Sequence, residues 1–264
     1  MADFKLIKTK LEDNNAIGVL TLNAPPVNAL SITLLKEIQA ALDEFQKAKV
    51  RAVVVTAAGN NAFCAGADVK EMASLEKDPA KAGEFLGLGN EVFNKIENFN
   101  APVIAAINNL TLGGGLELAL ACDVRISSDR ARFGLPEVSL GLIPAWGGIA
   151  RLPRLIGVGR AKELIFTGQL VNAQEAKTLG ILNKVVPDGD ELRAAMDIAK
   201  RISVKSSPVA VAAAKRAINA GMGETIDVAL AASEKEMGEV MTSEDLREGI
   251  KAFTEKRQPS FKGQ

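Results

Sequence analysis

Short β-like runs alternate with helical patterns through the first half of the chain, and this alternation constrains the fold more than any other feature of the sequence. The β-like runs are rich in β-branched and aliphatic residues, as in RAVVVT at 51–56 and PVIAAI at 102–107. Apolar residues recur at helical spacing over 31–47 and 82–98. Further strands are expected at 4–8, 16–22, 123–127 and 182–186, and a short helix is expected to begin near Ala67. This order predicts an α/β layered domain, and it fits a spiral and a doubly wound sheet equally well.

From about residue 160 the pattern changes to one helix after another. Asn172 and Glu175 have the spacing of a capping box, ahead of a helix that ends near Gly180. Later helices are expected at 191–202, 208–219, 226–241 and 243–256. We therefore predict an α/β core over residues 1–198 and a C-terminal helical region over residues 199–264. The helical region is expected to pack on the core or on a neighbouring subunit.

The residue types that are missing limit the chemistry. The 264 residues include no histidine and no tyrosine, which excludes Ser-His-Asp and Cys-His nucleophilic mechanisms and histidine-bound zinc. Proton transfer would pass through Asp, Glu, Lys, Cys or water, and carboxyl groups with a raised pKa are the leading candidates. Because 32 acidic and 32 basic side chains give zero net charge, neither nucleic acid nor an anionic membrane is an expected partner.

The two cysteines indicate a reducing compartment. Cys64 and Cys122 lie far apart and match no CxxC or metal-ligand spacing, which fits a reduced protein better than a disulfide scaffold. The first residues contain no apolar signal core, and no run of about 18 apolar residues occurs. We therefore expect a cytoplasmic protein without a metal site.

Two turns of small residues share one design. FCAGAD at 63–68 and LGGGLE at 112–117 each lead from a strand into a helix. The first turn of a helix has unpaired N–H groups and the positive end of the helix dipole, and glycine lets a ligand approach the backbone closely. Two such turns pointed at one spot would form an oxyanion hole for a carbonyl oxygen. Taken singly, each is more typical of an ordinary tight turn.

Two glutamates stand among apolar residues. Glu117 lies about one helical turn after Gly114, between leucines and alanines, and Glu137 follows Pro136 in FGLPEV. Burial and a second carboxyl nearby would raise the pKa of one of the pair, and two such groups can act on a water molecule as base and acid in turn. Taken singly, each glutamate is more typical of a surface or helix-capping position.

The segments FCAGAD, PVIAAINNLTLGGGLELALACDVRI and FGLPEVSLGLIP, in this order and spacing, resemble the enoyl-CoA hydratase (crotonase) superfamily. PPVNAL near the start and AFTEKR near the end also agree, so the resemblance covers nearly the whole chain. It implies an α/β fold that is a crotonase-like spiral of ββα repeats with a C-terminal helical trimerisation region. The implied assembly is a homotrimer or a dimer of trimers.

The activity that the resemblance implies is that of an enoyl-CoA hydratase, a hydro-lyase. Water adds reversibly and syn to a trans-2-enoyl-CoA and gives a 3-hydroxyacyl-CoA. The N–H groups of Ala67 and Gly114 would hold the thioester oxygen and stabilise an enolate. Glu117 would orient and deprotonate the water, and Glu137 would supply a proton to C2. No cofactor or metal is implied, because coenzyme A is part of the substrate.

The same resemblance implies the path of coenzyme A. The expected contacts are Pro26, Val27, Ala65, Ala67, Asp68, Val69, Lys70 and Gly114. Phe253 and Lys256 match positions that meet the nucleotide end of coenzyme A, often from the adjacent subunit. Lys256 could also be an ordinary solvated lysine at a helix end.

One departure from the family pattern bears on the substrate. The family commonly has GxGGTQRL where this chain has AWGGIARL at 145–152. Trp146, the one tryptophan, is either a wall of the acyl pocket or a packing aromatic. This departure, with the PPVNAL loop that recurs in isomerases, leaves a double-bond isomerase or a hydratase for a cyclic or branched acyl-CoA as the alternative. A non-catalytic CoA- or RNA-binding relative is less favoured, since zero net charge and 4% aromatics argue against RNA.

Overall fold

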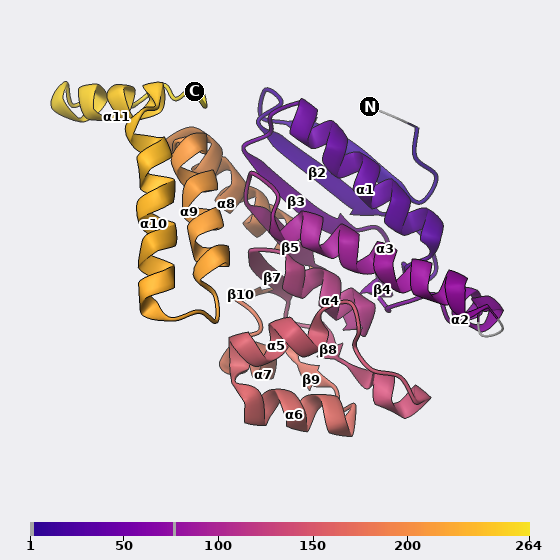
Figure 1. The fold of residues 1–264 in the computed structure, drawn as a ribbon. Coiled ribbons are helices and arrows are strands. Elements are labelled where there is room, and N and C mark those ends of the chain that lie inside the picture. Colours follow the sequence, from indigo (N-terminus) through magenta and orange to yellow (C-terminus); the bar gives the residue numbers. More distant parts are fainter. Residues whose placement is uncertain (1–2, 76–77) are drawn as a thin grey trace.

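The computed structural model describes residues 3–75 and 78–264, and its centre is a six-stranded sheet (Figure 1). The strand order is β1-β2-β3-β5-β7-β10, in which β1 and β2 pair antiparallel and the other neighbours pair parallel. These strands are β1 (Ile7–Glu12), β2 (Ile17–Leu22), β3 (Ala52–Ala57), β5 (Val103–Ile107), β7 (Val124–Ser128) and β10 (Lys184–Val186).

A second, four-stranded sheet repeats the order of the first. It runs β4-β6-β8-β9, formed by β4 (Ala62–Cys64), β6 (Leu110–Leu112), β8 (Arg132–Gly134) and β9 (Val171–Asn172). The chain passes from β3 to β4, from β5 to β6 and from β7 to β8, and successive turns lie side by side in both sheets. The expected spiral of ββα repeats is therefore confirmed, since a doubly wound sheet would instead reverse its strand order.

Helices complete each turn of the spiral and form the C-terminal region. They are α1 (Ile32–Lys47), α2 (Val69–Leu75), α3 (Pro79–Glu97), α4 (Gly114–Ala121), the 3₁₀ helix η1 (Pro136–Leu140), α5 (Gly148–Ile156), α6 (Val158–Thr167), α7 (Ala173–Leu179), α8 (Glu191–Lys205), α9 (Pro208–Gly221), α10 (Ile226–Met241) and α11 (Glu244–Thr254). Local signals set several ends: the Ser31 side chain accepts a hydrogen bond from Leu34 N, 3.1 Å away, and the capping box of Asn172 and Glu175 is present.

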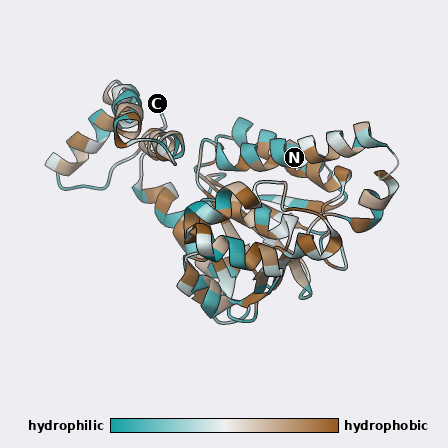
Figure 2. Ribbon diagram, turned by 60° about the horizontal axis from the view of Figure 1, so that its bottom comes forward, coloured by the Kyte–Doolittle hydropathy of each residue, from teal (hydrophilic) through white to brown (hydrophobic). Residues whose placement is uncertain are grey.

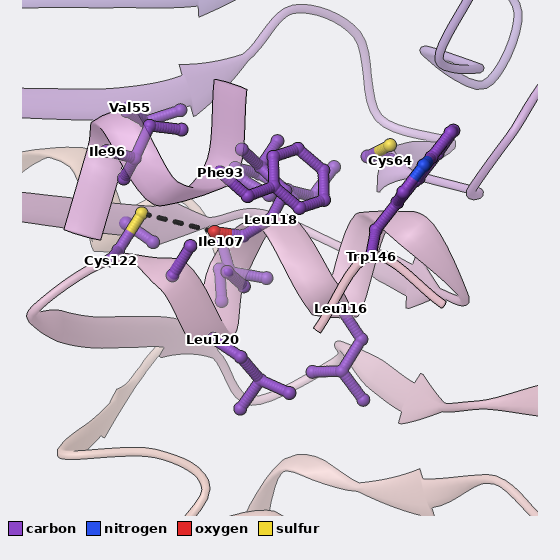
Figure 3. Close-up of a cluster of buried hydrophobic side chains, with 14 of the residues drawn as sticks. Val55, Cys64, Phe93, Ile96, Ile107, Leu116, Leu118, Leu120, Cys122 and Trp146 are labelled. Atoms are coloured by element: carbon purple, nitrogen blue, oxygen red, sulfur yellow. Dashed lines mark hydrogen bonds between the residues drawn. The ribbon is translucent and has the colours of Figure 1, made fainter. Parts of the chain in front are cut away.

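The central strands are buried on both faces, as parallel strands usually are. On β3, Val53 and Val55 belong to the main core with α1, α3 and α4, whereas Ala52 and Val54 pack against α8. The α8 residues in this second layer are Ala194, Ala195 and Ala199. Figure 3 shows the part of the main core around α4, with Leu116, Leu118 and Leu120 beside Phe93, Ile107 and Trp146.

The last three helices stand away from the sheets (Figures 1 and 2). α9 and α10 pack against each other. The exposed apolar side chains on α10 and α11 are Ile226, Val228, Leu230, Met237, Met241, Ile250 and Phe253. The division expected at residue 198 falls inside α8, and the two-part organisation stays a prediction. No helix in the described part of the chain is long and apolar enough to span a membrane.

The sequence-based expectations miss the shortest elements. β6, β8 and β9 have only two or three residues, too few for a period to be recognised. The expectations also miss α5, because it begins at Gly148 directly after Gly147 and contains Pro153. The strand expected at 4–8 instead covers Ile7–Glu12, where Lys and Glu alternate with the apolar residues and weaken the strand pattern.

Candidate active site

The two turns of small residues lie directly against each other. A Cβ atom on Gly66 would be 3.0 Å from Leu112 O and 3.3 Å from Gly114 N, and the φ of Gly66 is +101°. A Cβ on Gly115 would collide with Cys64 O. Since no side chain fits at either position, glycine is what permits this approach of two backbones from successive turns of the spiral.

The amides of Ala67 and Gly114 are the donors that this arrangement leaves available. Ala67 pairs with Leu30 in an isolated β-bridge, and the two hydrogen bonds are made by the residues on either side of Ala67. Leu30 N donates to Gly66 O, and Asp68 N donates to Leu30 O. Gly114 begins α4, and in that first turn the N–H groups have no helical acceptor. Within the described residues neither amide donates a hydrogen bond to another backbone group. Two available donors on backbones in contact, one of them at the positive end of a helix, suit an oxyanion, a role that stays a prediction.

Glu117 is buried beneath these amides. Only 2% of its surface is exposed, and its Oε1 accepts hydrogen bonds from Trp146 N (2.8 Å) and Gly148 N (2.7 Å). Burial raises its pKa to about 7; the charge of Glu137 adds to this increase, whereas the two amides and Arg151 oppose it. A carboxyl group that titrates near neutrality can both take up and return a proton.

Glu137 approaches the same turn from η1. Its Oε1 lies 2.9 Å from where a Cβ on Gly113 would be, so the carboxyl group sits on the backbone just before Gly114. Its Oε2 is buried and has no hydrogen-bond partner among the described residues, and burial raises the pKa of Glu137. Since an unpaired buried oxygen is costly, this atom is suited to a partner that arrives with a substrate or water. The structure thus brings both predicted carboxyl groups to one glycine turn.

Trp146 packs in the core and also lies against Gly114. Its indole, 4% exposed, meets the rings of Phe85 and Phe93 edge to face, with centroids 5.0 and 5.8 Å apart. A Cβ on Gly114 would lie 2.7 Å from its Cε3, and Figure 3 shows the indole at the end of this cluster. The interpretation of Trp146 as a packing aromatic is therefore confirmed, and its role as a wall of the acyl pocket stays a prediction.

The loop at residues 26–28 runs beside the 65–68 turn. Ala65 N donates to Val27 O (3.0 Å), and Asn61 Nδ2 donates to Pro26 O (3.3 Å). Val69 and Lys70 are exposed at the start of α2. The Asp68 carboxylate caps this helix by accepting from the N–H groups of Lys70 and Glu71. The predicted coenzyme A contacts from the first part of the chain are thus neighbours, with Asp68 committed to a helix cap.

Phe253 and Lys256 lie elsewhere. Phe253 is on α11 and is 87% exposed, and Lys256 follows directly after this helix. The α9–α11 group stands apart from α2 and α4 in Figures 1 and 2, so one chain does not bring these residues to its own site. Their supply by an adjacent subunit stays a prediction. Among the described residues, no group of three His, Cys, Asp or Glu side chains could hold a metal ion.

Sequence reasoning gave no role to Arg151. Its guanidinium is buried beside the 146–148 turn that supplies the two amides to Glu117. A possible signal was its place in the sequence, between Ala150 and Leu152 in the first turn of α5. A cation at the positive end of a helix dipole is unfavourable unless something else holds it there.

Comparisons with known proteins agree with this geometry. The model of the family described as enoyl-CoA hydratase/isomerase matches residues 12–264. A short-chain-enoyl-CoA hydratase of Clostridium acetobutylicum is 45% identical over 94% of each chain. A mitochondrial methylglutaconyl-CoA hydratase of Mus musculus is 42% identical over 96% of this chain and 82% of its own length. A crystal structure of an enoyl-CoA hydratase from Bacillus anthracis superposes with a TM-score of 0.93 at 41% identity, covering 98% of this chain and 100% of that chain.

Proposed function

This chain belongs to the enoyl-CoA hydratase/isomerase family, and we propose that it adds water reversibly and syn to a trans-2-enoyl-CoA, giving a 3-hydroxyacyl-CoA. One observation carries the proposal: two carboxyl groups with a raised pKa, Glu117 and Glu137, flank the glycine turn that begins α4. Hydration of an activated double bond needs a base for water and an acid for carbon, and this pair can supply both.

Binding begins at the thioester oxygen. It accepts hydrogen bonds from the N–H groups of Ala67 and Gly114, which polarise the conjugated carbonyl and make C3 electrophilic. As water attacks, negative charge moves to this oxygen as an enolate. One donor of this kind typically contributes about 3–4 kcal/mol to the transition state.

The glutamates move the protons. Glu117 is held through Oε1, which leaves Oε2 to take a proton from water while the water oxygen bonds to C3. Glu137 gives a proton to C2, so the product gains one water and the pair exchanges its charge. Proton exchange with solvent then restores the pair for the next turnover. Because the two groups interact, their titration belongs to the pair.

The reaction is not a redox reaction, and we propose that it uses no cofactor besides the coenzyme A that the substrate brings. Pro26, Val27 and Lys70 would line the path of coenzyme A. The exposed apolar side chains of α10 and α11 suit a homotrimer or a dimer of trimers, in which Phe253 and Lys256 would reach a neighbour's nucleotide site. The unpaired, buried Cys64 and Cys122 suit the cytoplasm.

The acyl group is proposed to be short. The indole of Trp146 stands beside Gly114 with Phe85 and Phe93 behind it, which closes this direction to a long chain. The name of the Clostridium relative is in keeping with this. The name of the mouse relative favours a second candidate, a branched acyl-CoA.

A substrate panel with product masses tests the function. Purified protein should abolish the conjugated thioester absorbance of crotonyl-CoA, with a product heavier by one water, and Glu137→Gln should lower kcat by about 10² or more. A product of unchanged mass would mean a double-bond isomerase, and a preference for a branched or cyclic enoyl-CoA would select that alternative. No turnover of any short- or medium-chain 2-enoyl-CoA would overturn the proposal. Salt-dependent RNA binding without turnover would favour the RNA-binding alternative.

A further inference from the structure

We propose that Arg151 is a positioning residue: its guanidinium fixes the 146–148 turn so that two backbone amides of this turn hold Glu117 in its working orientation and charge state. The contacts of Arg151 carry this inference. Only the activity assay at the end rests on the proposed function, and a fluorescence titration tests the inference without it.

The guanidinium lies against the backbone of the 146–148 turn. Gly147 has a φ of +107°, and a Cβ there would collide with Arg151 Nη1. Nη1 donates to Trp146 O (3.1 Å), and the backbone N–H of Arg151 donates to Gly147 O (2.7 Å). Arg151 therefore binds both carbonyl groups of the turn, the first through its side chain and the second through its backbone.

These two carbonyls control the donors to Glu117. The Trp146 carbonyl belongs to the peptide group that lies between Trp146 N and Gly148 N, and the Gly147 carbonyl shares a rigid plane with Gly148 N. Holding the Gly147–Gly148 plane sets the direction of Gly148 N–H, which reaches Glu117 Oε1 at 2.7 Å. Holding the Trp146–Gly147 plane fixes one side of the Trp146 Cα, whose N–H reaches the same oxygen at 2.8 Å. A substitution of Arg151 removes the side-chain hold and leaves the backbone bond in place.

The other end of the guanidinium is anchored on α3. Nη2 donates to Asn94 Oδ1 (2.8 Å) and to Glu97 Oε2 (2.7 Å). The last turn of α3 is itself held by α9, because Asn219 Nδ2 donates to Glu97 O (2.9 Å) and Lys215 Nζ lies 3.3 Å from Ile96 O. The support of the turn thus reaches through α3 to the C-terminal helices.

Arg151 is energetically unfavourable at its position in α5 when only that helix is considered. It stands in the first turn of α5, where the helix dipole disfavours a cation. Its Nε–H is buried and has no hydrogen-bond partner among the described residues. The placement is therefore explained by what Nη1 and Nη2 hold rather than by the stability of α5.

The charged groups that face Glu117 determine how its pKa changes when Arg151 is removed. Glu137 faces it from η1 and Arg151 from α5. Cys64 on β4 stays a neutral thiol, since burial raises its pKa to about 12, and Glu97 is paired with Arg151. Without Arg151, burial and Glu137 remain, and both raise the pKa of Glu117, while the amides that oppose them lose their fixed direction.

The single tryptophan provides the first test. Trp146 N binds Glu117, and the chain has no tyrosine, so tryptophan fluorescence titrated from pH 5 to 9 should follow Glu117 and lose this transition in Glu117→Gln. We expect Arg151→Met to raise the midpoint by about one pH unit, and Arg151→Lys, which keeps the charge, to raise it less. Arg51→Met is the matched control: Arg51 donates to Ser203 O and Phe261 O away from the site and should leave the midpoint unchanged.

The activity profile is the second test. A rise of about one unit in the pKa of the base lowers kcat/KM about tenfold at pH 6 and hardly at pH 9. A purely structural role would lower activity equally at all pH values. An unchanged midpoint in Arg151→Met, or an equal shift in Arg51→Met, would overturn the inference; if Arg151→Met does not fold, Arg151→Lys decides. A shifted midpoint in a protein without hydratase activity would uphold it and reject only the proposed function.

Discussion

Replacing Glu117 by glutamine should stabilise the protein above neutral pH and at the same time remove most of its activity. The glutamine Oε1 can accept the same two hydrogen bonds from Trp146 N and Gly148 N, so the local structure is retained. What is lost is a buried negative charge. We expect kcat to fall by about 10² or more, as for a positioned base.

The size of the stabilisation follows from the pKa. Burial raises the pKa of Glu117 from 4.5 to about 7, so the folded state binds the proton more tightly than the unfolded state. The resulting contribution to stability is complete below about pH 4.5 and is lost as the pH rises through about 7. A pKa difference of about 2.5 units corresponds to about 3 kcal/mol of stability. Because glutamine does not titrate, the Glu117→Gln variant does not lose this stability as the pH rises.

Urea denaturation at pH 5 and pH 8.5, at one protein concentration, measures this effect. Between the two pH values the free energy of unfolding of the wild type should fall by about 2.5 kcal/mol relative to that of Glu117→Gln, because pH 5 lies slightly above the pKa of the unfolded state. Glu163→Gln, at an exposed position on α6, is the control and should follow the wild type. If Glu117→Gln and the wild type show the same pH dependence of stability, burial does not raise the pKa of Glu117.

Three further predictions concern the acyl wall, the paired turns and a half-buried ion pair. Trp146→Ala should raise kcat/KM for a ten-carbon enoyl-CoA relative to crotonyl-CoA in the substrate panel, and an unchanged ratio would remove Trp146 from the acyl wall. Gly66→Ala would place a Cβ 3.0 Å from Leu112 O at a φ of +101°, so kcat should fall about 10²-fold while circular dichroism stays native; wild-type kinetics would contradict the convergent turns. Lys215→Met leaves the half-buried Asp123 without the partner 2.7 Å away, which should cost about 1–3 kcal/mol in chemical unfolding, and a loss below about 0.5 kcal/mol would mean that the pair is solvated.

Much of the fold could be predicted because strands such as β3 and β5 are long enough to show their pattern. The choice between a spiral and a doubly wound sheet could not, because it depends on which strands pair. In the structure that choice is visible in β4, β6 and β8, which have three residues each. Three residues fit a strand, a turn or a helix end equally well, so the second sheet could be expected only through a resemblance.

The site divides in a similar way. Glycine turns and glutamates among apolar residues are conspicuous in a sequence, because both are unusual in those surroundings. The support of Arg151 is not visible, since its partners Asn94 and Glu97 lie 57 and 54 positions away on a helix whose polar residues resemble any solvated face. These polar contacts depend on how α3 and α5 both pack against α4, and the sequence pattern does not determine that packing.

Two glycines in the sequence nevertheless lie directly against the carboxyl groups of Glu117 and Glu137. A Cβ on Gly113 would stand 2.9 Å from Glu137 Oε1, and a Cβ on Gly148 would stand 3.0 Å from Glu117 Oε1. Gly148 lies within α5, where any residue could adopt the backbone conformation, so the close approaches of Pro144 Cβ, at 2.8 Å, and of Glu117 are what require glycine there. Each of these two carboxyl groups thus lies against one glycine on a neighbouring element. A glycine that its own helix does not need therefore indicates that another segment packs closely against it.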